Sequence, residues 1–236
     1  SKWVGSHKSL LSWKMDGLTV VLTYQNGELV KAVTRGNGEV GEIITNNART
    51  FRNIPLHIPF NGDLVLRGEA VISYDDFKRI NEEIPEMEAK YKNPRNLCSG
   101  TVRQLNSAIT AERNVNFLAF FLVKADGAGR DTEPDFHNSR IEQFNWLNMQ
   151  GFSVVPNRIV REENLLDEMK EFEKRISEYA YPVDGLVVLY DDIAYGDSLG
   201  RTAKFPRNSI AFKWGDEVQE TTLRKIEWSP SRTGLI

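Results

Sequence analysis

Two stretches rich in β-branched and apolar residues, residues 18–24 and 29–34, lie on either side of the dipeptide Asn26-Gly27. Asn-Gly between two such runs is the strongest short signal for a β-hairpin, because both turn residues must adopt positive φ angles. The first part of the chain is therefore predicted to form antiparallel strands.

Strands and helices follow one another irregularly in the rest of the chain. Further strands are predicted at residues 63–72, 115–123, 185–190 and 209–214. A short helix after the first of these is expected to be capped by Asp75 and to bury Phe77 and Ile80.

Two longer helices are predicted between residues 138 and 176. Asn138 or Ser139 can cap one that ends at Gly151, with an apolar face of Ile141, Phe144 and Leu147. The apolar face of the other consists of Leu165, Met169, Phe172 and Ile176. Hairpins mixed with helices, without regular βαβ alternation, indicate an α+β fold with antiparallel sheets.

Bulk composition sets the class of protein. The 236 residues suffice for one large domain, and 40% hydrophobic with 27% charged residues is ordinary for a soluble globular protein. No apolar run approaches the roughly 20 residues that span a bilayer, and no signal peptide is recognisable. The single cysteine, Cys98, excludes an internal disulfide framework and a CxxC zinc pair, so we expect a cytoplasmic protein with no membrane partner.

Charge is distributed unevenly. The net charge of −3 is not that of a free-standing DNA-binding protein. Acidic residues dominate between residues 127 and 197, whereas the segments that hold the motifs below are net basic. This polarity favours a phosphate-binding face and weak contact with nucleic acid.

The segment Lys14-Met15-Asp16-Gly17 carries the clearest chemical signal. On an extended segment, Lys14 and Asp16 are expected to point to the same side. A lysine held near a carboxylate and a phosphate can act as an amine nucleophile. By itself the four-residue motif is weak, and a surface lysine before a strand is the alternative.

Other motifs follow Lys14 in a fixed order. They are Thr34-Arg35-Gly36-Asn37-Gly38-Glu39-Val40-Gly41-Glu42, Thr45-Asn46-Asn47-Ala48-Arg49-Thr50, Arg67-Gly68-Glu69, Asn93-Pro94-Arg95-Asn96, Gly100-Thr101-Val102-Arg103-Gln104-Leu105, Val183-Asp184-Gly185-Leu186-Val187-Val188 and Ala211-Phe212-Lys213. In this order, the chain resembles the adenylation domain of bacterial NAD-dependent DNA ligases.

The resemblance implies a fold and a division of the chain. The fold is the nucleotidyltransferase fold of DNA ligases and capping enzymes, with two antiparallel β-sheets and flanking helices. Residues 11–227 would form the adenylation domain, residues 1–10 the remnant of an upstream connection, and residues 228–236 a linker into an absent OB-fold. The helical subdomain, zinc finger, helix-hairpin-helix and BRCT modules of the family would lie outside this chain.

The resemblance also implies an activity. Lys14 would attack the α-phosphate of NAD, expel nicotinamide mononucleotide and become lysyl-AMP. The AMP would pass to the 5′-phosphate of a DNA nick, which is then sealed in replication and repair. NAD would be the AMP donor, Mg²⁺ or Mn²⁺ the metal, and nicked double-stranded DNA a weakly bound partner of a monomer. Zinc would belong only to the modules outside this chain.

Site residues are carried over by position. Lys14, Asp16, Asp184 and Lys213 match catalytic positions of the family. Those expected to bind the nucleotide are Ser12, Lys14, Arg35, Glu69, Phe120, Val188, Leu189 and Lys213. Those expected to contact the nick or the leaving nucleotide are Arg95, Arg103 and, if one residue is inserted before Asp184, Arg175. No metal ligand is assigned.

Two positions depart from the family pattern. Ser12 stands where the family usually has a glutamate that reads adenine, and Leu189 where it has a lysine on the phosphate. Loss of one such electrostatic contact costs on the order of 100- to 1,000-fold in rate. A catalytically weakened nucleotide- or nick-binding module and an ATP-dependent polynucleotide ligase therefore remain as alternatives. The match over residues 34–50 favours the NAD branch.

Overall fold

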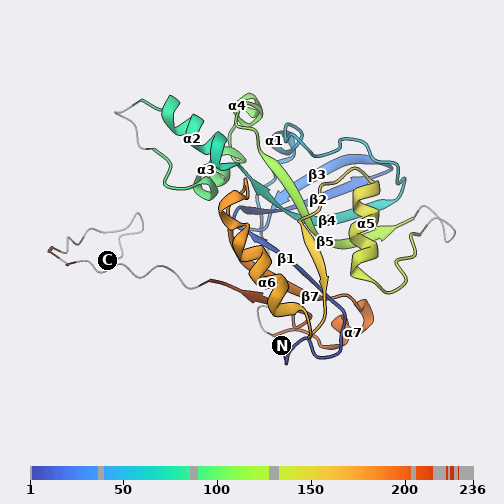
Figure 1. Cartoon of the computed structure of the whole chain (residues 1–236). Coiled ribbons are helices and arrows are strands. Elements are labelled where there is room, and N and C mark those ends of the chain that lie inside the picture. The colour runs from blue at the N-terminus through green and yellow to red at the C-terminus, as the bar shows by residue number, and fades with distance from the viewer. Residues whose placement is uncertain are drawn as a thin grey trace.

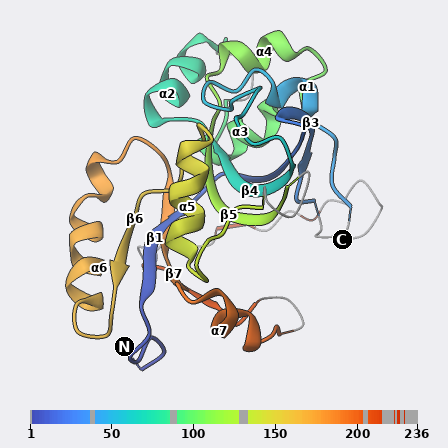
Figure 2. The same ribbon diagram turned by 90° about the vertical axis from the view of Figure 1, so that its right-hand side faces the viewer.

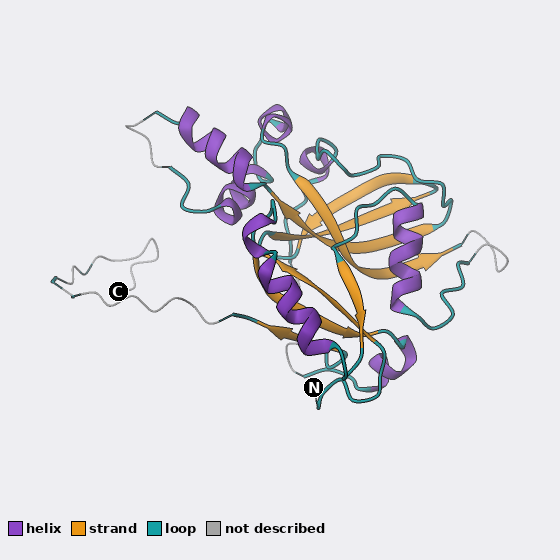
Figure 3. Ribbon diagram, viewed as in Figure 1, coloured by secondary structure: helices purple, strands orange, loops and turns teal. Residues whose placement is uncertain are grey.

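Two four-stranded antiparallel sheets and the helices around them make up the described part of the chain (Figures 1 and 3). The computed structural model describes residues 2–36, 40–85, 90–127, 133–202 and 206–214, and residues 222, 224, 225 and 228. The predicted α+β class with two antiparallel sheets is confirmed. In these ranges no helix has the length and apolar character needed to cross a bilayer.

The first sheet has the order β3-β2-β4-β5. Its strands are β2 (Leu18–Gln25), β3 (Glu28–Thr34), β4 (Asp63–Val71) and β5 (Asn116–Asp126). The predicted hairpin is confirmed: Gln25 pairs with Glu28, and Asn26 and Gly27 have φ angles of 51° and 81°. These are the positive φ values that a two-residue hairpin turn requires.

The second sheet has the order β6-β1-β7-β8. It contains β1 (Ser9–Met15), β6 (Asn157–Val160), β7 (Val183–Tyr190) and β8 (Ser209–Phe212). β1 and β6 were not predicted as strands. β8 ends at Phe212, so Lys213 follows the strand instead of lying within it as expected.

The chain crosses from one sheet to the other between β1 and β2, at Asp16 and Gly17. A Cβ atom on Gly17 would lie 2.1 Å from the carbonyl oxygen of Ala70 in β4. Only glycine allows the backbone to pass this close. The Lys14-Met15-Asp16-Gly17 motif therefore lies where the two sheets meet.

Helices cover the sheets on different sides. They are α1 (Thr45–Ala48), α2 (Tyr74–Glu83), α3 (Pro94–Thr101), α4 (Ser107–Glu112), α5 (Arg140–Met149), α6 (Leu165–Lys174), the 3₁₀-helix η2 (Ile176–Glu178) and α7 (Ile193–Ser198). Figure 2 shows α6 beside β6 and β1, and α5 in front of the strands at the centre. Helices α1 to α4 lie together in the upper part of Figure 2, next to the first sheet.

Each sheet has its own buried core. The larger core includes Leu22, Leu66 and Phe117 from the first sheet, and the smaller includes Leu11 and Leu186 from the second. The predicted faces of α5 and α6 contribute Phe144, Leu147, Leu165 and Phe172.

Several local predictions differ from the structure. Ser73, not Asp75, caps α2, because its hydroxyl accepts the N–H of Asp76. Ser139 precedes α5, but its hydroxyl donates to Asp191 and makes no cap hydrogen bond. Ile176 lies beyond the end of α6, in η2.

Of the two expected domain boundaries, the one between residues 10 and 11 lies within the described residues. β1 begins at Ser9 and Val4 is buried in the smaller core, so the packed unit begins before residue 11. The expected linker at residues 228–236 lies outside the described residues except for Trp228.

Candidate active site

A cavity of about 310 Å³ lies where the two sheets meet. Both sheets, α5 and the segments that hold Arg35 and Arg95 contribute to its lining. The residues are Leu10, Ser12, Trp13, Lys14, Met15, Asp16, Thr19, Arg35, Glu69, Arg95, Phe120, Phe144, Val187 and Leu189. A volume of this size is within the range of small-molecule sites.

Strand alternation decides which side chains of β7 face the cavity. Ser12 pairs with Val187 and Leu10 pairs with Leu189, so these four share one face. Val188 pairs with Leu11 on the opposite face and is buried in the smaller core. Val188 was expected to bind the nucleotide, but it does not line the cavity. Its neighbour Val187 lines the cavity instead.

Lys14 lies on the same face of β1 as Leu10 and Ser12. Its Nζ donates to both oxygens of Asp184, at 2.7 and 2.9 Å. Lys213 Nζ lies 2.9 Å from Asp184 Oδ2. One carboxylate thus holds two ammonium groups from β1 and from the end of β8.

The environment of Asp184 sets its charge. Partial burial alone would raise the pKa of this carboxyl, but the hydrogen bonds and positive charges of Lys14 and Lys213 together lower it. Asp184 is therefore an ionised acceptor and a weak base.

Asp16 has a different partner from Lys14. Its Oδ1 accepts from Arg95 Nη1 at 2.9 Å, and both residues line the cavity. Arg95 lies in the first turn of α3, so this ion pair connects α3 to the crossing between the sheets. The expectation that Lys14 and Asp16 face the same space agrees with their both lining the cavity.

Glu69 in β4 is the most perturbed carboxyl of the site. Its Oε2 accepts from the hydroxyl of Thr19 at 3.0 Å, across the β2–β4 pair. Burial raises the pKa of Glu69 from 4.5 to about 7, although hydrogen bonds from Thr19 and the Gly17 backbone and the charges of Lys14 and Arg95 act in the opposite direction. The backbone N–H of Arg35 donates to the Thr19 carbonyl oxygen at 3.0 Å, which places Arg35 beside this pair.

Phe120 reaches the cavity through an irregularity in β5. Arg67 pairs with Phe121 and Gly68 pairs with Ala119, so Phe120 is the extra residue of a β-bulge. A bulge changes the direction of a side chain that regular alternation would place elsewhere. Phe120 is partly buried and lines the cavity, and its contact with a nucleotide stays a prediction.

Two predicted residues lie away from the cavity. Arg103 pairs with Glu42 and donates to the Ser99 carbonyl oxygen, beside a separate depression of about 370 Å³. Arg175 follows the last residue of α6. Neither side chain lines the 310 Å³ cavity.

Sequence reasoning missed several residues that line the cavity: Leu10, Trp13, Met15, Thr19, Phe144 and Val187. Strand alternation could have identified two of them. Leu10 lies four residues before Lys14, and Val187 lies two residues before Leu189, so each shares a face with a predicted site residue. Thr19 had none, since its position opposite Glu69 depends on the β2–β4 register.

The arrangement combines an amine, three carboxylates, neighbouring cations and apolar walls. Such a set suits a ligand with an apolar ring at one end and a phosphate at the other. Among the described residues, no three His, Cys, Asp or Glu side chains are grouped to hold a metal ion.

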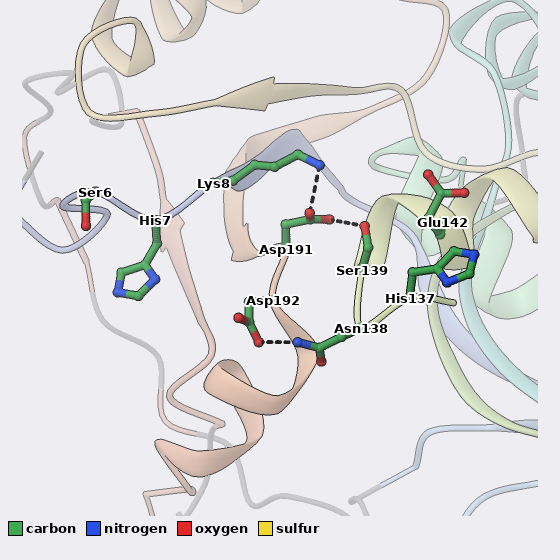
Figure 4. A pocket seen from close by; sticks show the side chains of 9 residues that line it. All are labelled: Ser6, His7, Lys8, His137, Asn138, Ser139, Glu142, Asp191 and Asp192. Carbon is green, nitrogen blue, oxygen red and sulfur yellow. Dashed lines mark hydrogen bonds and ion pairs between the residues drawn. The ribbon is translucent and has the colours of Figure 1, made fainter. Parts of the chain in front are cut away.

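A second depression, of about 540 Å³, lies outside the sheets near the start of β1 and of α5 (Figure 4). Two side-chain contacts cross it: an ion pair of Lys8 with Asp191 at 2.9 Å, and a hydrogen bond that the Asn138 amide donates to Asp192 at 2.8 Å. The His7 ring stacks on Tyr195. These contacts connect the segments that lead into β1, α5 and α7, which is a structural role.

Known proteins resemble this chain in sequence and in structure. The profile of the NAD-dependent DNA ligase adenylation domain matches residues 3–217. A DNA ligase of Lachnoclostridium phytofermentans is 62% identical over 99% of this chain, and one of Ruminiclostridium cellulolyticum is 60% identical over 100% of this chain. The chain spans 35% of the length of each of these relatives.

A solved archaeal ATP-dependent RNA ligase has a similar fold, with a TM-score of 0.50. The match covers 90% of this chain and 44% of that one, at 17% sequence identity. At this identity the similarity concerns the fold alone.

Proposed function

Because this chain belongs to the family of NAD-dependent DNA ligase adenylation domains, we propose that it transfers AMP from NAD to Lys14 as the first step of DNA nick sealing. The observation that carries the proposal is the Lys14 amine, held by both oxygens of Asp184 at the edge of a cavity between two sheets. Nick sealing by the whole ligase is part of the same proposal, because this chain spans only about a third of the length of its relatives.

NAD is a substrate of this reaction, and the cavity offers groups for its adenosine half. Phe120, Val187 and Leu189 provide apolar surface for the adenine ring. Ser12 offers the adenine a hydroxyl, and Glu69 and Arg35 offer polar groups to the ribose. Lys14 and Lys213 would bring two positive charges to the α-phosphate.

The covalent step uses the Lys14 amine as nucleophile. After losing one proton to water, Nζ attacks the α-phosphorus, a P–N bond forms, and the P–O bond to nicotinamide mononucleotide breaks. The leaving nucleotide takes the electron pair of that bond. The nitrogen then releases a second proton to water. Lys213 stabilises the charge that develops on the phosphoryl oxygens.

Asp184 contributes to the reaction by orienting other side chains. Its lowered pKa makes it a poor proton acceptor, so it orients the two lysines instead of serving as the general base. Both of its oxygens are also engaged by lysines, which disfavours direct metal ligation. A Mg²⁺ or Mn²⁺ ion would be held mainly by the phosphates of the substrate, as is common for nucleotide-bound Mg²⁺.

Later steps involve DNA. Lysyl-AMP would pass its AMP to the 5′-phosphate of a nick, and the 3′-hydroxyl would then displace AMP. Arg95 borders the cavity and suits contacts with phosphate or the leaving nucleotide, while Arg103 and Arg175, away from it, suit contacts with DNA further along. We propose a monomer that acts in the cytoplasm, with residues 228–236 leading into a following domain.

Lys14→Arg tests the nucleophile in the full-length protein. Arginine keeps the charge next to Asp184 but cannot attack, so covalent AMP is expected to fall by more than roughly 1,000-fold after incubation with NAD and Mg²⁺. Intact mass and peptide mapping measure the adduct. Lys8→Arg, at the ion pair with Asp191 outside the cavity, is the matched control and should retain the adduct.

Other outcomes would contradict the assignment. AMP mapped to a different lysine, or sealing without any lysyl-AMP, would remove Lys14 from its role. An adduct that forms with ATP but not with NAD would place the chain with ATP-dependent enzymes. Nucleotide binding without an adduct would support the weakened module.

A further inference from the structure

Thr19 connects two residues to which the proposed function gives a ribose role. Its hydroxyl donates to Glu69 Oε2 at 3.0 Å, and its carbonyl oxygen accepts the backbone N–H of Arg35 at 3.0 Å. Thr19 is half-buried at the start of β2 and lines the cavity itself. One residue thus contacts both neighbours of the expected ribose.

The Thr19–Glu69 contact is set by the sheet. The two residues are directly opposite in the β2–β4 pair, where side chains on one face lie within hydrogen-bond reach. A threonine side chain has few rotamers in a strand, so its hydroxyl is a rigid donor. Glu69 has three rotatable bonds and needs such a partner to present its carboxylate in one direction.

We propose that Thr19 is a positioning residue for NAD binding, which orients the Glu69 carboxylate toward the ribose. This inference rests on the proposed function, because the ligand of Glu69 is the ribose of NAD. Thr19 acts through Glu69 and takes no part in the attack by Lys14.

Because the pKa of Glu69 lies near neutral pH, one hydrogen bond from the Thr19 hydroxyl can change the fraction of Glu69 that is ionised. Burial raises the pKa of Glu69 to about 7, while the Thr19 hydrogen bond, the Gly17 N–H, Lys14 and Arg95 lower it. The Cys98 thiol of α3 is also near and has a raised pKa from burial and from Glu69. Near neutral pH, removal of one donor therefore shifts Glu69 toward the protonated form, which is the weaker acceptor.

Thr19→Val in the full-length protein removes the hydroxyl and keeps the shape. We expect the KM for NAD in lysyl-AMP formation to rise about three- to tenfold at pH 7, the effect of one lost hydrogen bond, with kcat changed less than twofold. The rise should shrink at higher pH, where Glu69 is ionised in both proteins. Thr19→Ser restores the hydroxyl and should return the KM toward the original value.

Thr23→Val is the matched control, because Thr23 is half-buried on the same strand and does not line the cavity. An NMR titration of the Glu69 carboxyl without NAD provides a readout independent of activity. Its pKa should rise by roughly half a unit or more in Thr19→Val and stay unchanged in Thr23→Val.

The outcomes separate this inference from the proposed function. If Lys14 is adenylated but Thr19→Val leaves both the KM and the Glu69 pKa unchanged, the positioning role of Thr19 is wrong and the proposed function stands. An equal rise of KM in Thr23→Val would show a general packing effect and also overturn it. If Lys14 is never adenylated, the proposed function fails, whatever the Glu69 titration shows.

Discussion

At the scale of single residues, the site is organised by carboxylates whose environments differ. Asp184 accepts from two lysines and has a lowered pKa, whereas Glu69 is mostly buried and has a pKa raised to about 7. The two groups are therefore suited to different tasks: Asp184 to hold cations permanently, and Glu69 to respond to pH and to a ligand.

The raised pKa of Glu69 predicts a pH-dependent stability. The unfolded chain loses this proton near pH 4.5 and the folded chain near pH 7, so the folded state binds more protons between these values. The free energy of unfolding should therefore fall as pH rises from 4.5 to 7, and level off above 7. The limit of this contribution is roughly 3 kcal/mol, from about 1.4 kcal/mol per pKa unit.

Glu69→Gln, which cannot ionise, should remove this slope. Urea unfolding of the isolated chain at pH 5 and pH 8 measures the free energy for both proteins. Glu83→Gln, at an exposed position on α2, is the control and should keep the slope. An identical pH dependence in Glu69→Gln and the unsubstituted protein would mean that Glu69 is ionised throughout this range.

At the scale of the elements, the two faces of β7 have separate purposes. Leu189 faces the cavity opposite Leu10, while Val188 faces the smaller core opposite Leu11. Neighbouring residues of one strand thus line the cavity and the hydrophobic core, respectively.

Paired substitutions test this division. Leu189→Lys should fold, because its ammonium group can extend into the cavity, and it should increase the affinity for AMP by roughly tenfold through attraction to the phosphate. Val188→Lys places a charge in the core and should destabilise the protein by roughly 3 kcal/mol or more. Calorimetric AMP titration and urea unfolding measure the two effects.

Two results would require another view of Leu189. Unchanged AMP affinity in a folded Leu189→Lys protein would mean that another cation already neutralises the phosphate. A loss of stability equal to that of Val188→Lys would mean that Leu189 is packed as a core residue.

At the scale of the whole molecule, the chain holds the groups proposed for the adenosine half of NAD. The chain spans 35% of the length of its relatives, so their remaining sequence is about twice as long as this chain. Among the residues that line the cavity, Arg95 is the one proposed to meet the leaving nucleotide. Positioning of the leaving group is therefore expected to need residues beyond this chain.

This expectation predicts a split between binding and chemistry. The isolated 236 residues should bind AMP about as well as the full-length protein, but form lysyl-AMP far more slowly, since positioning can supply roughly 7–11 kcal/mol of barrier reduction. Calorimetry with AMP and a time course of intact mass with NAD compare the two proteins. Equally fast lysyl-AMP formation by the isolated chain would mean that Arg95 and its neighbours position the leaving group unaided.

Local patterns in the sequence determined much of the architecture. The Asn26-Gly27 hairpin, the apolar faces of α5 and α6 and the strand that carries Asp184 depend on residues close together in the chain, and turn geometry and side-chain period express them directly. The motif residues Lys14, Asp16, Glu69 and Phe120 were likewise identified by their place in an ordered series. For these, the sequence alone named residues that line one cavity.

Only the tertiary structure decided which side chains meet. The contact of Lys14 with Asp184 joins residues 170 positions apart, and Thr19 reaches Glu69 because β2 and β4 pair in one register. Phe120 reaches the cavity through a bulge, a single-residue shift in pairing that reverses the face of a strand. A local pattern cannot specify such shifts, because the free energy that selects a register comes from partners far away in the sequence.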